Sequence, residues 1–236
     1  MIMGFRFRQF SVSDDQASMK VGTDAVLLGA WAGRGNPANI LDIGTGSGLI
    51  ALMMAQRFSS GMIHAIDIHP ASVTQARENF NSSAWSQRLT ATQMPLQEYA
   101  TQYKSRYELI VSNPPYFTDS LLPPDPSKKL ARHTGTLSYR EIAEGVVALM
   151  HPEGSFNLIL PYENQDDFER LAAACGLKQS RQLIIVPVKG KKPNRILSEW
   201  QLSASQIISD SLAIRNADHQ YSEEYKALTG EFYLAL

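Results

Sequence analysis

Short apolar runs and amphipathic segments alternate through the middle of the chain. Asn39–Ile43 and Met62–Asp67 are apolar runs of strand length, and each is followed by apolar residues at helical spacing. The first of these helices is predicted over residues 49–58, and Pro70, a residue that favours the first helical position, begins the second. Strands that alternate with helices are typical of a parallel sheet covered by helices.

The alternation continues as far as Gly176. Ser138 and Glu141 have the spacing of a capping box and predict a helix over 138–150, and a further helix is predicted over 164–175. Additional strands are predicted at 88–93, Tyr107–Ser112 and 154–160. Two later runs, 182–188 and 196–203, have a connection so short that they form an antiparallel pair.

These elements predict a doubly wound, Rossmann-like α/β fold whose sheet is mostly parallel and ends in a C-terminal antiparallel hairpin. A length of 236 residues suits a single domain. We expect a core over 35–206, preceded by a segment of residues 1–34 with a helix at Thr23–Trp31. A tail over 207–236 follows, with a helix between Ser222 and Gly230.

Composition excludes several classes of protein. One cysteine, Cys175, rules out an internal disulfide, and no Cys/His spacing resembles a zinc site, so no metal is expected. We find no signal peptide and no apolar stretch of membrane-spanning length, and we therefore expect a cytoplasmic protein. The net charge of −1 is low for a protein that coats nucleic acid, although it does not exclude local basic patches. The oligomeric state stays open.

A glycine loop, Gly44-Thr45-Gly46-Ser47-Gly48, lies between the first predicted strand and its helix. Glycines there permit a tight turn and a close approach of the backbone to a ligand. Asp67 closes the next strand, where a carboxylate accepts hydrogen bonds from ribose hydroxyls. Asp42 beside the glycines would repel a pyrophosphate but suits a positively charged group. The loop therefore predicts a nucleoside-bearing cofactor and modestly favours S-adenosylmethionine (SAM) over a dinucleotide.

The strand at Tyr107–Ser112 ends in Asn113-Pro114-Pro115-Tyr116. The prolines fix their own backbone and hold the preceding asparagine extended, so the corner is stiff. It presents two acceptors, the Asn113 side-chain oxygen and the Pro114 carbonyl, which suit an NH₂ group. Tyr116 is placed to stack on a flat ring. We expect Asn113, Pro114 and Tyr116 to be catalytic, with Asn113 also adjoining the cofactor.

Together these motifs resemble those of SAM-dependent amino-group methyltransferases. Over essentially the full length, the chain resembles more closely the bacterial tRNA(Val) adenine-N6-methyltransferase family, which modifies the adenine just 3′ of the anticodon. The segments that carry this resemblance are 19–31, 41–48, 113–117, 131–133 and 221–229. It implies the class I methyltransferase fold, SAM as cofactor and an adenine N6 in tRNA as methyl acceptor.

The resemblance also assigns roles outside the motifs. Lys20 and Thr23 belong to a leading segment that covers the cofactor in relatives. From its position directly after Asp67, Ile68 would form an apolar wall against the cofactor adenine. The predicted cofactor contacts are thus Lys20, Thr23, Asp42, Gly44, Gly46, Gly48, Asp67, Ile68 and Asn113. The predicted substrate contacts are Phe117, Arg132, His133, Lys191 and Lys192.

One position departs from the family pattern. Related enzymes usually place an aspartate after the third strand, where it accepts from the cofactor's adenine amino group. Here the stretch is Thr92-Gln93-Met94-Pro95-Leu96-Gln97, without an acid at that position. We expect a side-chain or backbone carbonyl between Gln93 and Leu96 to replace it.

Two basic loops follow strands whose ends point toward the cofactor. The first carries Lys128, Lys129 and Arg132, and the second carries Lys189, Lys191, Lys192 and Arg195. In a parallel sheet both project from the carboxyl edge, so together they predict an RNA-phosphate surface.

Three functions fit these motifs: an RNA adenine-N6 methyltransferase, a protein-glutamine methyltransferase, and a nucleotide-dependent oxidoreductase or non-catalytic SAM-binding module. The proline corner disfavours the third, since hydride transfer has no use for it. Protein-glutamine enzymes usually carry a helical domain before the glycine loop, and few residues precede it here.

Overall fold

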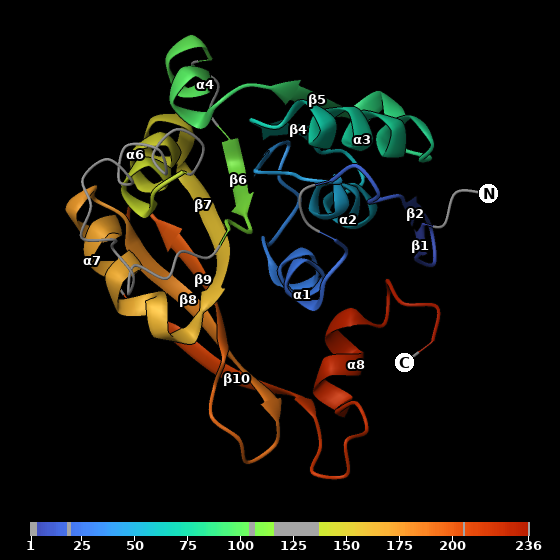
Figure 1. The fold of residues 1–236 in the computed structure, drawn as a ribbon. Helices are drawn as coiled ribbons and strands as arrows, with labels where there is room; N and C mark the ends of the chain where they lie inside the picture. Colours follow the sequence, from blue (N-terminus) through green and yellow to red (C-terminus); the bar gives the residue numbers. More distant parts are fainter. Residues whose placement is uncertain (1–3, 18–19, 104–106, 116–136, 205, 236) are drawn as a thin grey trace, which may run out of the picture.

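A twisted eight-stranded sheet forms the centre of the molecule (Figure 1). The structure, a computed structural model, describes residues 4–17, 20–103, 107–115, 137–204 and 206–235. The strand order is β10-β8-β9-β7-β6-β3-β4-β5. The strands are β3 (Asn39–Ile43), β4 (Met62–Asp67), β5 (Leu89–Gln93), β6 (Tyr107–Ser112), β7 (Met150–Pro161), β8 (Lys178–Val188), β9 (Arg195–Gln201) and β10 (Ile208–Arg215).

Helices cover both faces of this sheet, each over its own apolar cluster. One face carries α1 (Thr23–Trp31), α2 (Leu49–Arg57), α3 (Pro70–Asn81) and α8 (Glu223–Thr229). The other carries α4 (Leu96–Gln102), α6 (Tyr139–Leu149) and α7 (Gln165–Ala174). Short elements complete the described chain: β1 (Phe5–Arg6), β2 (Ser11–Val12), η1 (Ser86–Arg88) and η3 (Tyr162–Asn164). No helix in the described residues is long and apolar enough to cross a membrane.

The predicted fold class is confirmed. Strands β3 to β7 run parallel in the order β7-β6-β3-β4-β5, and β9 pairs antiparallel with both β7 and β8. The capping box at Ser138 is present, with both reciprocal hydrogen bonds. Gly176 ends the segment after α7 in the left-handed conformation, at φ +88°. Local sequence signals therefore located most elements correctly.

The C-terminal tail was predicted incompletely. Residues Ile208–Arg215 form β10, which extends the sheet beyond the hairpin by pairing parallel with β8. In this edge strand Leu212 is buried, whereas the side chains from Ile208 to Ser211 are exposed. The alternation that reveals a half-buried strand is therefore missing. The boundaries at residues 34 and 206 stay predictions, although β10 joins the same sheet as the core.

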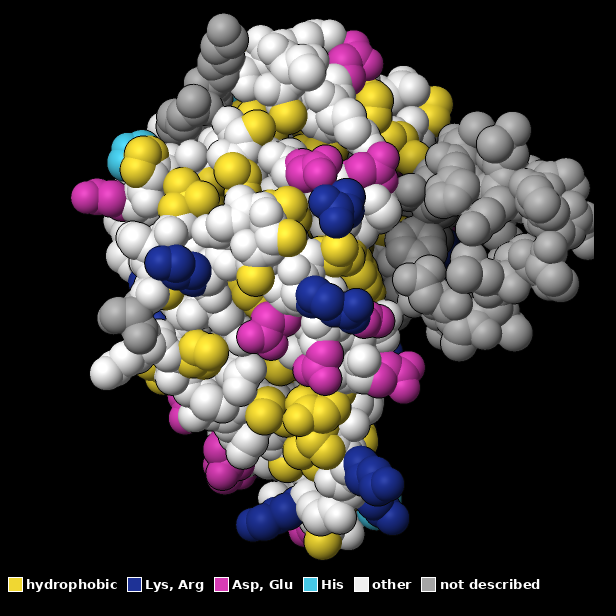
Figure 2. Space-filling model, turned by 90° about the vertical axis from the view of Figure 1, so that its left-hand side faces the viewer, with side chains coloured by type: hydrophobic (Ala, Val, Ile, Leu, Met, Phe, Trp, Pro, Cys, Tyr) yellow, Lys and Arg dark blue, Asp and Glu magenta, His cyan; other side chains and the backbone are white. Residues whose placement is uncertain are grey.

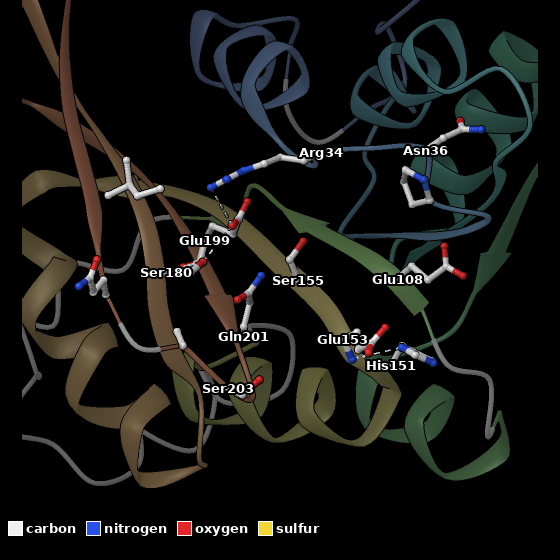
Figure 3. A pocket seen from close by; sticks show the side chains of 14 residues that line it. Arg34, Asn36, Glu108, His151, Glu153, Ser155, Ser180, Glu199, Gln201 and Ser203 are labelled. Carbon is white, nitrogen blue, oxygen red and sulfur yellow. Dashed lines mark hydrogen bonds and ion pairs between the residues drawn. The ribbon is translucent and has the colours of Figure 1, made fainter.

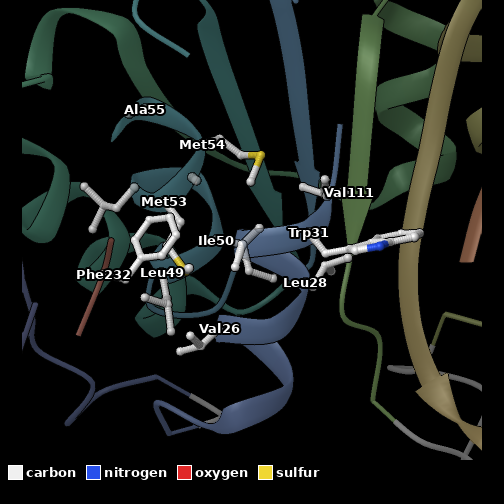
Figure 4. Packing of buried hydrophobic residues seen from close by; sticks show 14 of the residues in the cluster. Val26, Leu28, Trp31, Leu49, Ile50, Met53, Met54, Ala55, Val111 and Phe232 are labelled. Atoms are coloured by element: carbon white, nitrogen blue, oxygen red, sulfur yellow. The ribbon is translucent and has the colours of Figure 1, made fainter. Parts of the chain in front are cut away.

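Helix α1 packs closely on α2 in the centre of one face (Figure 4). Gly29 makes this approach possible, because a Cβ at that position would lie 2.4 Å from the Met53 sulfur and 3.0 Å from its Cβ. Both ends of α1 are also tied to the hairpin strands. Arg195 Nε donates to Asp24 Oδ2 at 2.8 Å, and the Arg181 guanidinium lies 3.8 Å over the Trp31 ring.

The Gly29–Met53 contact generates a stability prediction. Gly29→Ala should lower the free energy of unfolding by about 1–3 kcal/mol through overpacking. Met53→Ala should cost about 2–5 kcal/mol through the cavity it leaves. Because the new methyl would occupy part of that cavity, the double variant should lose less than the sum of the two single losses, as measured by urea unfolding. Strictly additive losses would contradict close packing of α1 on α2 at this point.

Candidate active site

A cavity of about 1250 Å³ lies at the carboxyl edge of β3, β4, β5 and β6. The strand ends meet there because parallel strands direct their following loops to one edge of the sheet. Its walls come from five parts of the chain that are distant in sequence. They are the glycine loop, residues 112–115, residues 66–69, residues 93–98, and Lys20 with residues 22–25; Leu137 and Glu141 complete the lining.

The three glycines of the loop have different neighbours. All have positive φ, at 72° for Gly44, 56° for Gly46 and 83° for Gly48, a conformation that side chains disfavour. A Cβ on Gly44 or Gly46 would meet no atom within 4 Å, and both glycines line the cavity. A Cβ on Gly48 would instead lie 2.5 Å from the Phe80 ring. The first two therefore leave room for a ligand, whereas Gly48 permits packing of the loop on α3.

Asp67 ends β4 and is 7% exposed at the cavity wall. Its Oδ2 accepts from the Gly46 amide at 2.9 Å, and its Oδ1 accepts from the His69 amide at 2.9 Å. Each carboxylate oxygen has a second lone pair, so the group can still accept from two hydroxyls. Ile68 follows with an exposed fraction of 38% and presents an apolar surface to the same cavity.

Asp42 lies under the glycine loop and is absent from the lining of the cavity. Its Oδ2 accepts from the Thr45 hydroxyl at 2.6 Å, while its Oδ1 has no hydrogen-bond partner among the described residues. Burial raises the pKa of this carboxyl from 3.8 to about 7, against the opposing effect of the Thr45 bond. The arrangement supports the loop from below and does not place Asp42 against a ligand.

The proline corner lies beside the glycine loop. Ser112 pairs with Ile43 across β6 and β3, and its hydroxyl donates to the Ile43 carbonyl at 2.9 Å. Asn113 follows, 8% exposed, and lines the cavity with Pro114 and Pro115. The predicted sites at Tyr116, Phe117, Arg132 and His133, with Lys128 and Lys129, lie outside the described residues.

The leading segment closes one side of the cavity. Lys20 and Thr23, which the resemblance predicts as cofactor contacts, both line it. Lys20 Nζ donates to the Asp14 carbonyl at 2.7 Å and lies 3.5 Å from the Asp14 carboxylate, which steadies the segment before α1. Arg195, predicted to belong to the RNA-phosphate surface, is half-buried and paired with Asp24 at 2.8 Å.

The stretch from Gln93 to Gln97 has no acid but does have amide acceptors, and Glu98, which follows it, also lines the cavity. Gln93, Met94, Pro95 and Leu96 all line the cavity, as does Gln97. Gln97 Nε2 donates to Glu141 Oε1 at 2.8 Å, which leaves the Gln97 side-chain oxygen able to accept. The sequence indicates a role for Glu141 only as a helix cap and none for Gln97. The capping box was the available signal, but it does not say which other helix lies opposite.

A second cavity, of about 630 Å³, lies at the opposite, amino edge of the sheet (Figure 3). Two of its charged side chains, Glu199 and Arg34, already form an ion pair. Glu199 pairs with Arg181 at 2.9 Å and Arg34 at 3.5 Å, and it accepts from the Ser180 hydroxyl at 2.9 Å. The described residues contain no group of three or more His, Cys, Asp or Glu side chains able to hold a metal ion.

The buried carboxyl of Asp42 predicts a pH dependence. Because its folded-state pKa is raised to about 7, the folded protein holds this proton more tightly than the unfolded chain does. Stability attributable to Asp42 is therefore lost as pH rises from about 4 to about 7. Asp42→Asn keeps an oxygen for Thr45 and stays neutral, so its free energy of unfolding relative to wild type should rise by up to about 4 kcal/mol over that range. Urea unfolding at several pH values measures this difference, and parallel curves for the two proteins would contradict it.

Comparison with known proteins identifies the family. Residues 18–133 match the methyltransferase small domain. A tRNA1(Val) (adenine(37)-N6)-methyltransferase of Bacteroides fragilis is 44% identical over 98% of both chains. The enzyme of the same name from Escherichia fergusonii is 40% identical over 98% of this chain and 95% of its own.

Among solved structures, a predicted O-methyltransferase from Agrobacterium tumefaciens matches with a TM-score of 0.69. It is 18% identical over 91% of this chain and 99% of its own, a likeness that concerns the fold alone. The near-complete coverage and the identity to the curated relatives show that this chain belongs to the tRNA1(Val) (adenine(37)-N6)-methyltransferase family.

Proposed function

We propose that this protein transfers the methyl group of SAM to N6 of adenine 37 in tRNA1(Val), in the cytoplasm. The observation that carries the proposal is the placement of Asn113 and Pro114 beside the glycine loop in one cavity. At about 1250 Å³ this cavity exceeds the ~300–1,000 Å³ typical of a single small-molecule site. It therefore has room for a nucleoside cofactor and an inserted base.

The lining suits the chemistry of SAM. Asp67 has two lone pairs to accept from ribose hydroxyls, and Ile68 offers an apolar surface to an adenine ring. The bare backbone of Gly44 and Gly46 permits close approach of the methionine part. Lys20 and Thr23 would cover the bound molecule, while Asp42 and Gly48 would act indirectly by shaping the loop. When bound, SAM supplies an activated methyl group on its sulfonium.

Asn113 and Pro114 would hold the acceptor nitrogen. The adenine amino group has a lone pair delocalised into the ring, and acceptance of both N–H bonds favours a pyramidal nitrogen with its lone pair free. Catalysis then consists mainly of positioning and of stabilising the positive charge that grows on nitrogen. The proton can leave after transfer, so no strong base is required beforehand. Tyr116 would stack on the base, and Phe117, Arg132 and His133 would contact the RNA around it.

Methyl transfer from labelled SAM distinguishes the proposal from the protein-glutamine alternative. The substrate is total tRNA from a strain that lacks this protein. After the reaction, the tRNA is digested and its methylated nucleosides are identified. We expect N6-methyladenosine in the tRNA1(Val) fraction. Label found only in protein would instead favour glutamine methylation.

Asn113→Ala should lower turnover by roughly 100-fold or more, because it removes a preorganised polar group from the transition state. SAM affinity, measured by calorimetry, should change little. Asn36→Ala is a matched control, since Asn36 lies in the cavity at the opposite edge of the sheet. Near-normal turnover of the Asn113 variant would overturn the proposed mechanism.

A further inference from the structure

The β8–β9 hairpin tip and the turn after β10 form one projection. Because β10 lies parallel to β8, the two loops leave the sheet side by side (Figure 1). The Lys189 amide donates to the Arg215 carbonyl at 2.8 Å and so joins them. We call the set Lys189, Lys191, Lys192 and Arg215 the basic prong.

The prong is held in place by the turn beneath it. The Arg215 guanidinium lies 4.1 Å over the Tyr221 ring, and its Nη1 donates to the His219 carbonyl at 2.6 Å. Arg215 and Tyr221 also form a backbone bridge. Tyr221 in turn stacks on Tyr225 of α8, which is buried against the core. The tip is therefore built on the folded domain and does not depend on a free loop for its position.

The charge of the prong is largely unneutralised. Lys189, Lys191 and Lys192 are exposed, and none makes an ion pair within the described residues. Asp218 is the single acidic residue of the two loops. Lys and Arg side chains accordingly gather at the narrow lower end of the molecule (Figure 2). A protein of net charge −1 thus concentrates positive charge at one end.

The prong lies on the same edge as Asn113 but apart from it. In the sheet order β6-β7-β9-β8, three strand spacings separate the strand before Asn113 from the strand before Lys189. At roughly 4.8 Å per spacing the lateral separation is about 14 Å. At about 3.4 Å per stacked nucleotide this spans about four nucleotides along one strand. The prong therefore lies nearer to nucleotides some distance along the RNA than to the base held at Asn113.

We propose that the basic prong binds backbone phosphates of a folded RNA arm distant from the target adenine, so that tight binding requires structured RNA. This inference rests on the proposed function and adds a substrate requirement to it. Phosphate contacts position a nucleic acid without reading its sequence. They would hold the tRNA while the adenine leaves its stack to reach Asn113.

Binding of two RNAs tests the proposal: the complete tRNA1(Val) transcript, and a single-stranded oligonucleotide of about seven nucleotides centred on the target adenine. Lys191→Glu/Lys192→Glu should weaken tRNA binding and reduce the slope of log affinity against log salt by about 2. Affinity for the oligonucleotide and for SAM should not change. Lys178→Glu is the control, because Lys178 begins β8 at the opposite edge.

Arg215→Lys separates charge from position. It keeps the positive charge but loses the planar stack on Tyr221. It should weaken tRNA binding with little change in salt slope, and thermal unfolding checks that the fold is retained.

If the double variant binds tRNA with wild-type affinity and wild-type salt dependence, these loops are solvated surface without a role in RNA binding. An equal loss for tRNA and oligonucleotide would overturn the requirement for folded RNA. If wild-type protein binds tRNA in this prong-dependent way but forms no N6-methyladenosine, the proposed function fails while the binding surface stands.

Discussion

The position of α1 is the constraint on which much of the site depends. Gly29 lets the helix approach α2, and Arg195 and Arg181 tie its two ends to the hairpin strands. Its amino end, at Thr23 and Asp24, forms part of the cavity wall. The hairpin that bears the basic prong is thereby linked to the cavity wall through α1, in addition to its pairing with β7 in the sheet. Movement of α1 would alter the cavity and the hairpin together.

Three buried carboxyl groups show how surroundings decide what an acid does. Asp67 accepts from two backbone amides, and its carboxylate lines the cavity. Asp42 has one oxygen without a hydrogen-bond partner among the described residues, and its pKa is raised. Its other oxygen supports the glycine loop by accepting from the Thr45 hydroxyl. Glu199 is compensated by two arginines at the opposite edge and contributes to structure. For Asp42, burial disfavours the charged form by more than its hydrogen bond with Thr45 favours it.

The sequence by itself determined what depends on neighbouring residues. Strand β3, the glycine turn and the proline corner are each encoded within a few residues, so both motifs were located to the residue. Their meeting at one edge was also predictable, because parallel strands turn at the same edge. Asp67, Ile68 and Asn113, predicted from the sequence as cofactor contacts, line one cavity.

Only the tertiary structure decided which side chains pair across distant segments. It neutralised Arg195 with Asp24, turned Gly48 against Phe80 and brought Gln97 to Glu141. It also placed β10 beside β8. The sequence does not predict this pairing, because a mostly exposed edge strand lacks the alternation of hydrophobic and polar residues. Hydrophobic periodicity records whether a residue is buried, and short motifs record local backbone geometry. Neither records the partner, because that is decided by how elements far apart in the chain pack together.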